Sequence, residues 1–286
     1  MQNHPREIFK GTGNPCYIIA EVGINHNGSL DTAKRLIDVA VSARADCVKF
    51  QKRNPDVCVP EEQKSQMRQT PWGYIPYIDY RRIVEFDKPE YDDIDQYCFD
   101  RGIDWSASAW DTDSVDFLDQ YHIPFIKIPS AKITDVEYLK RVKDTGKPII
   151  ASTGMADMDI LRKLWEIIGG DETALLHCIS TYPSNPAEIN LNIIKALKTT
   201  FGCVVGYSGH ERGIQSPLAA VAIGAKIIEK HITLDRSMWG TDQSASLEPD
   251  GLKRLVRDIR IIEFSMGDGI KRFLDSEREV ARRLRG

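Results

Sequence analysis

The sequence has no apolar run approaching the roughly 20 residues that a membrane-spanning helix needs. Its first residues, MQNHPREIFKG, are too polar for a secretory signal peptide. The chain also lacks a large excess of either charge, and its net charge of −4 gives no reason to expect a nucleic acid or an anionic membrane as a partner. We therefore expect a cytoplasmic protein that binds no membrane and no nucleic acid.

Cysteine is scarce, at 6 of 286 residues, and the six show no CxxC pair and no zinc-ligand spacing. Cys47, Cys178 and Cys203 lie inside apolar runs, where cysteine behaves as a small hydrophobe. We expect reduced thiols that serve neither as nucleophiles nor as metal ligands. A complete phosphate-loop motif is also lacking, although glycines at 154, 206, 209 and 213 permit tight turns.

What the chain does have is a repeated unit of a short apolar run, a polar turn and a helical pattern. The eight runs cover residues 17–23, 47–51, 104–110, 125–130, 148–154, 174–180, 203–206 and 225–229. Helices are expected over about 30–44, 91–101, 157–168, 190–199, 215–223 and 250–265, and from about 113 and 135. Near-continuous apolar runs are typical of strands buried on both faces. Eight such alternations predict an α/β fold of the (β/α)8 TIM-barrel type, with a doubly wound open sheet as the alternative.

Two segments depart from the repeat. Residues 52–90 form an abnormally long connection after the second strand, and we expect an irregular stretch there. Its aromatic residues, among them Trp72 and Tyr80, argue against disorder and favour either a lid over the substrate or a surface that packs on another subunit. Residues 266–286 are expected to be a charged tail that is helical near its end. We expect one barrel domain over residues 1–286.

In a barrel the chemistry lies at the carboxyl ends of the strands. The polar residues there are Glu21, Lys49, Gln51, Ser108, Lys127, Ser130, Lys132, Ser152, Ser180, Tyr182, Ser208, His210, Glu229, Lys230 and His231. Lys49 and Lys127 lie in apolar runs, where an unpaired ammonium is costly, so each needs an anionic partner. That partner is either a phosphate and a carboxylate of a ligand, or Glu21 or Glu229 of the chain. Lys127 is also a candidate Schiff-base lysine.

The histidines at 210 and 231 follow the seventh and eighth runs. Parallel strands joined by a helix lie side by side, so the two imidazoles are expected to converge at one edge of the sheet. With Asp242 shortly after, the pair predicts a divalent-metal site. The alternative is that each histidine only satisfies a hydrogen bond at a strand end.

Seven motifs, taken together, resemble the sialic acid synthase family over roughly residues 8–265. They are IIAEVGINHNG (18–28), VKFQ (48–51), IKIPS (126–130), STGM (152–155), LHCISTYP (176–183), GYSGH (206–210) and IEKHITLDR (228–236) with ASLEPD (245–250). The family condenses phosphoenolpyruvate with an N-acylated hexosamine aldehyde on a TIM barrel. The resemblance implies a divalent metal, Mn2+ or Mg2+, held by His210 and His231.

The resemblance also implies roles for the remaining site residues. Phosphoenolpyruvate is expected to contact Lys49, Gln51, Ser108, Lys127, Ser130, Ser152, Ser180 and Ser208. The sugar or metal-bound water is expected to contact Glu21, Tyr182 and Asp242. Of these, Glu21, Lys49, Lys127 and Asp242 are the expected catalytic residues. In the mechanism that the resemblance implies, C3 of phosphoenolpyruvate attacks the aldehyde, water adds at C2, and phosphate leaves by C–O cleavage.

Three departures from the family pattern bear on the second substrate. The chain stops before the small antifreeze-like domain that many members carry, which supplies an arginine to the sugar's acyl group. Lys132 stands where the family often has an acidic residue, which suits a phosphorylated or carboxylated sugar, and Gly209 replaces the usual aspartate. We expect a homo-oligomer, commonly a dimer in the family. The alternatives are a Schiff-base lyase acting through Lys127 and a non-catalytic sugar-binding barrel.

Overall fold

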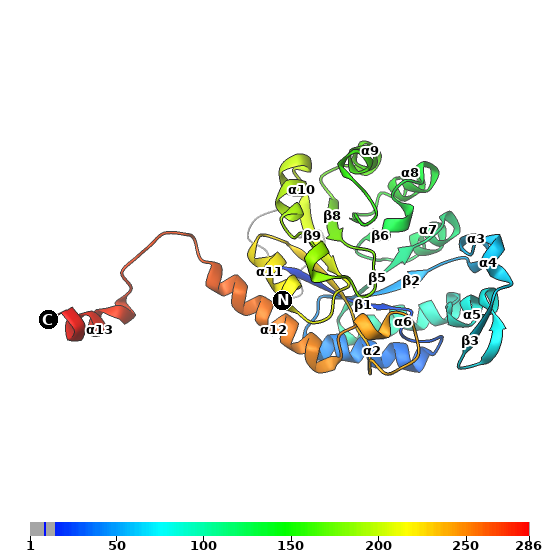
Figure 1. Cartoon of the computed structure of the whole chain (residues 1–286), viewed down its shortest axis with the longest axis horizontal. Coiled ribbons are helices and arrows are strands. Elements are labelled where there is room, and N and C mark those ends of the chain that lie inside the picture. The colour runs from blue at the N-terminus through cyan, green and yellow to red at the C-terminus, as the bar shows by residue number, and fades with distance from the viewer. Residues whose placement is uncertain (1–8, 10–14, 286) are drawn as a thin grey trace.

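Eight parallel strands close into a barrel, with helices packed around it (Figure 1). The structure, a computed structural model, describes residue 9 and residues 15–285, so residues 1–8, 10–14 and 286 of the expected domain and tail lie outside the described part. Within that part the barrel strands are β1 (Tyr17–Gly23), β2 (Cys47–Lys52), β5 (Asp104–Ala109), β6 (Ile126–Ile128), β7 (Ile149–Ser152), β8 (Thr173–Cys178), β9 (Val204–Gly209) and β10 (Ile227–His231). Their order around the ring is β1-β10-β9-β8-β7-β6-β5-β2, which confirms the TIM barrel.

The strands alternate between two hydrophobic cores. In β1, Tyr17 and Ile19 belong to the core inside the barrel, whereas Ile18 and Ala20 belong to the core between strands and helices. This alternation follows from the two-residue period of a strand. Because Tyr17 and Ile19 fill the lower barrel, the next residue on the same face, Glu21, reaches the open end at the carboxyl edge. The apolar filling therefore leaves the carboxyl end for polar side chains.

The helices follow the strands as expected. They are α2 (Leu30–Ala43), α6 (Lys88–Arg101), α7 (Thr112–Asp119), α8 (Val136–Asp144), α9 (Met158–Ile168), α10 (Ile193–Phe201), α11 (Gln215–Ala222) and α12 (Pro249–Met266). Aspartates open several of them: Asp157 accepts the backbone N–H groups of Asp159 and Ile160 at the start of α9. Short 3₁₀ turns cover Ser130–Lys132, Pro186–Glu188 and Gln243–Ala245.

The long connection after β2 is built of regular elements, so the expectation of an irregular stretch over 52–90 was wrong. It contains α3 (Pro55–Cys58), α4 (Glu61–Lys64), a hairpin of β3 (Met67–Thr70) and β4 (Gly73–Pro76), α5 (Tyr77–Val84) and the start of α6. The aromatic rings hold it to the loop after β10, since the ring centroid of Trp239 lies 5.1 Å from that of Tyr80 and 5.9 Å from that of Trp72. The insertion therefore forms a wall on one side of the barrel.

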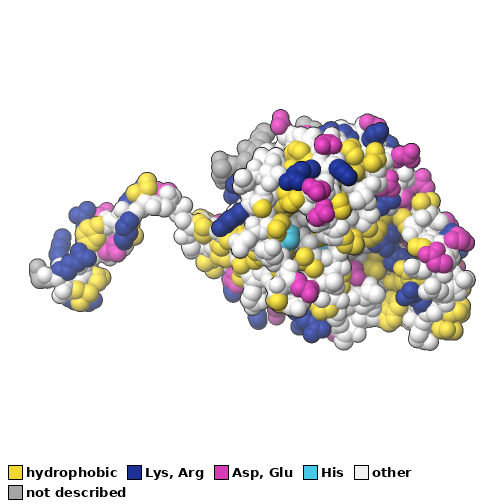
Figure 2. Space-filling model, turned by 45° about the horizontal axis from the view of Figure 1, so that its top comes forward, with side chains coloured by type: hydrophobic (Ala, Val, Ile, Leu, Met, Phe, Trp, Pro, Cys, Tyr) yellow, Lys and Arg dark blue, Asp and Glu magenta, His cyan; other side chains and the backbone are white. Residues whose placement is uncertain are grey.

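The C-terminal segment leaves the barrel. Helix α13 (Asp275–Arg285) stands away from the body in Figures 1 and 2, and none of its described side chains is buried. Over the body, acidic and basic side chains are intermixed on the face in Figure 2. Across residue 9 and residues 15–285, no helix has the length and apolar character that a membrane crossing requires.

Candidate active site

A cavity of about 210 Å³ opens at the carboxyl ends of the strands. Twelve of the fourteen predicted site residues line it: Glu21, Lys49, Gln51, Ser108, Lys127, Ser130, Ser152, Ser180, Tyr182, Ser208, His210 and His231. Strand register explains why they meet, since Glu21 pairs with Lys49 on one side and with His231 on the other. The polar ends of the strands therefore form one layer across the top of the apolar core.

The two lysines of the cavity are held by carboxylates of the chain. Lys49 Nζ lies 2.6 Å from Glu21 Oε2 and 3.7 Å from Glu229 Oε2, and Lys127 Nζ lies 3.8 Å from the same Glu229 oxygen. Hydroxyls complete both ammonium groups, with Ser108 Oγ 2.7 Å from Lys49 and Ser152 Oγ 2.5 Å from Lys127. The internal lysine–glutamate network offered as one alternative for these lysines is therefore present.

The network leaves its two acids in different states. Burial raises the pKa of Glu21 despite the nearby Lys49 ammonium. Burial acts on Glu229 in the same direction, but Lys127 and Lys49 together outweigh it and lower the pKa of Glu229. Burial also lowers the pKa of Lys127, whereas the two carboxylates raise that of Lys49. Glu21 is thus the carboxylate that takes up a proton first when a further anion enters.

Small side chains and backbone groups pack closely on the wall of the cavity formed by Ser130, Gly154, Cys178 and Ser180. The Gly154 N–H donates to Ser130 Oγ at 3.0 Å, and Ser130 Oγ lies 3.2 Å from Cys178 Sγ. A Cβ at position 154 would lie 2.2 Å from Ser180 Oγ, so any side chain there would displace the Ser180 hydroxyl. The result is a cluster of hydroxyl donors near Lys127, which suits the oxygens of a phosphate.

The two histidines converge at the cavity, with ring centroids 5.6 Å apart. His210 Nδ1 lies 2.6 Å from the Ile179 carbonyl oxygen, which can only accept, so Nδ1 carries the hydrogen and the Nε2 lone pair faces Tyr182 Oη at 2.8 Å. His231 Nδ1 is buried and has no hydrogen-bond partner among the described residues. Burial, and then the neighbouring imidazole, lowers the pKa of His210 to about 4; burial also lowers that of His231.

This donor set fits a divalent cation. Two neutral imidazoles are ordinary ligands for such an ion. Within the described residues, no group of three His, Cys, Asp or Glu side chains is arranged as a metal cage. Water or substrate would therefore fill the remaining coordination positions, as in an open catalytic site.

The two predicted residues that do not line the cavity lie close by. Asp242 Oδ2 is 3.9 Å from His231 Nδ1, at the rim formed by the loop after β10. The Lys132 ammonium lies 2.7 Å from Asp135 Oδ2 instead of facing the cavity. A role for Lys132 in recognising the sugar stays a prediction, and it would require this ion pair to open.

The structure also adds residues that sequence reasoning missed. The cavity is further lined by Trp110, Pro129, Ala131, Met155 and Cys178, and by Glu229, which was expected only as a partner of the lysines. Trp110 and Met155 each follow a strand end by one to three residues, which was the available signal. Arg53 is a second case, because its guanidinium stacks on Trp110 and was not expected at the site.

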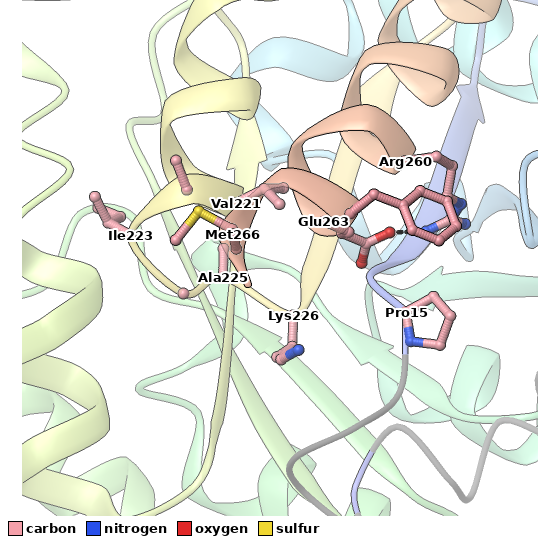
Figure 3. Close-up of a pocket in the computed structure, with 11 residues that line it drawn as sticks. Pro15, Val221, Ile223, Ala225, Lys226, Arg260, Glu263 and Met266 are labelled. Carbon is pink, nitrogen blue, oxygen red and sulfur yellow. Dashed lines mark hydrogen bonds and ion pairs between the residues drawn. The ribbon is translucent and has the colours of Figure 1, made fainter. Parts of the chain in front are cut away.

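A larger cavity, of about 600 Å³, lies at the opposite end of the barrel between α11, α12 and the start of β10 (Figure 3). Its walls include Val221, Ile223, Ala225 and Met266, and Arg260 pairs with Glu263 at 2.9 Å beside them. Barrel enzymes carry their chemistry at the carboxyl ends of the strands, so the smaller and more polar cavity is the candidate active site.

The fold and the carboxyl-end cavity together define the class: a TIM-barrel enzyme whose site is built for a small anionic substrate. Known proteins agree. Residues 36–271 match the model of the NeuB family. The chain is 38% identical over 272 residues to N-acetylneuraminate-9-phosphate synthase of Homo sapiens, covering 93% of this chain and 76% of that protein. It is 39% identical over 269 residues to N,N'-diacetyllegionaminic acid synthase of Campylobacter jejuni, covering 92% and 80%.

A solved structure agrees as well. The N-acetylneuraminic acid (sialic acid) synthetase from Leptospira borgpetersenii, in complex with citrate, superposes with a TM-score of 0.84 at 34% identity, covering 95% of this chain and 93% of that one. The chain belongs to the NeuB family of phosphoenolpyruvate-condensing nonulosonic acid synthases. Membership favours condensation over the two alternatives, a Schiff-base lyase and a non-catalytic barrel.

Proposed function

We propose that this chain joins phosphoenolpyruvate to the open-chain aldehyde of a sugar, an N-acylhexosamine or a related aldose. The products are a 3-deoxy-2-ulosonic acid and inorganic phosphate. The observation that carries the proposal is the single polar layer in which two buried lysines and several hydroxyls adjoin a pair of neutral histidines. Each component suits one part of this reaction.

The lysines and hydroxyls would hold phosphoenolpyruvate through its two anionic groups. Lys127 has Ser152 as a neighbour and lies on the side of Ser130, Ser180 and the Gly154 N–H, which suits the phosphate. Lys49 lies beside Ser108, which suits the carboxylate. The entering anion would replace Glu21 or Glu229 as the partner of the lysines. The two ammonium groups would then stabilise the negative charges of the phosphate and the carboxylate throughout the reaction.

The reaction then needs one new C–C bond, one water and one C–O cleavage. C3 of phosphoenolpyruvate bonds to the aldehyde carbon, water adds its oxygen to C2, and the C2–O bond to phosphate breaks. A divalent ion, Mn2+ or Mg2+, held by His210 and His231 would supply a Lewis acid for the aldehyde oxygen. Glu21, whose pKa burial raises, would carry the water's proton to the new hydroxyl. Tyr182 and Asp242 at the rim would contact the sugar.

The test is release of inorganic phosphate from phosphoenolpyruvate with Mn2+, against aldoses, N-acylhexosamines and their phosphates. Metal-dependent release with an acceptor supports the proposal and identifies the substrate. His210→Ala and His231→Ala should each lower Mn2+ affinity, measured by calorimetry, and abolish release. Release that resists a chelator, or borohydride trapping of pyruvate on Lys127, would contradict it.

A further inference from the structure

Arg53 follows β2 directly and lies between the candidate active site and a neighbouring cavity of about 320 Å³ that it helps to line. Its guanidinium carbon is 3.8 Å from the centre of the Trp110 ring, and Nη2 donates to Gln51 Oε1 at 2.5 Å. Both contacts line the active-site cavity. The stacked ring and the amide therefore hold the plane of the guanidinium in one orientation at the mouth of the site.

This guanidinium forms no direct ion pair within the described part of the chain, although burial lowers the pKa of Arg53 and the nearby Glu85 carboxylate opposes that effect by raising it. Lysines around it are all paired: Lys49 with Glu21, Lys52 with Glu85, and Lys132 with Asp135. Glu85 Oε1 instead accepts the backbone N–H of Arg53, at 2.9 Å. Arg53 Nε is buried and lacks any hydrogen-bond partner among the described residues. Arginine stays charged, so a guanidinium with a buried Nε that lacks a hydrogen-bond acceptor, and with no direct ion pair, suits an anionic ligand.

The position of Arg53 decides which substrate supplies that anion. Lys49 and Lys127 already serve the two anionic groups of phosphoenolpyruvate within the barrel. Arg53 lies beyond the last strand residue, and its partner Gln51 donates to Glu21 Oε1 at 3.2 Å, next to His231 in the strand register. Gln51 and Glu21 thus connect the guanidinium to the strand end that carries His231, so an acceptor at the histidines would extend toward Arg53.

We propose that Arg53 binds the phosphate of a phosphorylated sugar acceptor and makes the enzyme selective for it. The inference rests on the proposed condensation and names the class of its second substrate. A flat guanidinium with free N–H groups matches a phosphate in a bidentate manner, which a lysine does not. The ion pair of Lys132 with Asp135 makes Arg53, and not Lys132, the cation offered to the sugar.

The experiment compares acceptors that differ only in the phosphate. Mannose, N-acetylmannosamine and arabinose are each assayed beside mannose 6-phosphate, N-acetylmannosamine 6-phosphate and arabinose 5-phosphate. The wild type should favour the phosphorylated member of a pair at least tenfold in kcat/KM. Arg53→Gln should raise KM for that acceptor ten- to a hundredfold, with KM for phosphoenolpyruvate within twofold of wild type. Arg53→Lys should recover part of the loss.

Arg82→Gln is the matched control, because Arg82 lines the neighbouring cavity but is exposed and paired with Asp56 and Asp79. It should behave as wild type. Preference for a neutral acceptor or for a hexuronic acid, or an equal loss on both members of a pair, would overturn the role of Arg53 and leave the condensation intact. If no acceptor releases phosphate, the condensation itself fails. Calorimetric binding of mannose 6-phosphate then decides the role of Arg53: loss in Arg53→Gln supports it, and equal binding overturns it.

Discussion

His26 is buried outside the cavity, where it packs against aromatic rings. Its ring stacks on Phe86 with centroids 4.1 Å apart, and its Nδ1 accepts the Gly28 N–H at 3.1 Å. Burial lowers the pKa of His26 to about 3. The folded state therefore holds this imidazole neutral, whereas the unfolded chain protonates it below about pH 6.5.

This difference predicts acid sensitivity. The contribution of neutral His26 is complete above about pH 6.5 and is lost as the pH falls, by about 1.4 kcal/mol per pH unit down to about pH 3. Between pH 7 and 5 the wild type should lose about 2 kcal/mol more unfolding free energy than His26→Gln. Urea unfolding at several pH values measures it. Parallel curves for the two proteins would contradict the buried neutral state.

Gly154 predicts a separable effect on substrate binding. In Gly154→Ala the new Cβ must displace the Ser180 hydroxyl, because the two atoms would lie 2.2 Å apart. We expect KM for phosphoenolpyruvate to rise at least tenfold. Gly251→Ala, in the first turn of α12, is the control, since its Cβ meets only ordinary contacts with Leu247, and it should leave KM unchanged. Equal KM values for the two variants would exclude a role for this wall.

For single residues, the sequence predicts which side chains come together at the site better than it predicts which ion pairs their charged groups form. Glu21, Lys49 and His231 were expected together because each lies toward the carboxyl end of an apolar run, and barrel topology brings these ends to one edge. Lys132 does not line the cavity, because an aspartate three residues later pairs with its ammonium, so its role stays a prediction. Arg53 was missed because its place depends on Trp110, which the sequence separates from it by most of an insertion and a helix.

Strands β9 and β10 are joined beyond their last paired residues by a buried ion pair. Backbone pairing ends at Gly209 and Lys230, one residue before each histidine. There Lys230 Nζ donates to Glu211 Oε1 at 3.0 Å and also to the Glu211 backbone carbonyl. Tyr207 Oη donates to the other oxygen of Glu211, at 2.6 Å. This clamp adjoins both histidine positions and continues the pairing of the two strands through side chains.

Breaking the clamp on one side should be costly. Lys230→Met leaves the Glu211 carboxylate buried without its cation, and we expect a loss of about 3–5 kcal/mol in unfolding free energy. The double variant Lys230→Met with Glu211→Leu should recover most of that loss, because two apolar groups replace the pair. A urea-unfolding double-mutant cycle measures the coupling. Additive losses would show that the two residues act independently.

The insertion after β2 shows where element prediction fails. Its helix α5 is only eight residues long, and Tyr80 and Val84 are its buried apolar side chains, so charged neighbours obscure the helical period. Its fixed position depends on contacts of Trp72 and Tyr80 with Trp239, which lies far along the chain. No local pattern encodes such a contact. By contrast, the barrel strands are visible as apolar runs because both of their faces are buried.

For the molecule as a whole, we expect that removing the C-terminal helix α13 leaves the thermal stability of the barrel almost unchanged. None of the described side chains of α13 is buried, so a chain ending at Gly267 should keep its melting temperature within about 1–2 °C. Differential scanning calorimetry at several concentrations measures it, with light scattering on the same samples. A larger drop, together with loss of an oligomer, would show that α13 packs on another copy. The expected dimer stays a prediction until then.

The barrel closes where its first strand meets its last, since β1 pairs with β10 from Tyr17–Ile227 to Glu21–His231. The candidate active site takes residues from both sides of this seam, among them Glu21 and His231. During synthesis, therefore, no substrate can bind before the residues through His231 have emerged and the first strand has found the last. Because only the closed barrel binds the ligand, binding stabilises the folded state by about 2.7 kcal/mol at a ligand concentration a hundredfold above Kd. Substrate therefore stabilises the closed barrel against states in which β1 and β10 are not paired, and enzymatic activity is expected only from chains whose barrel has closed.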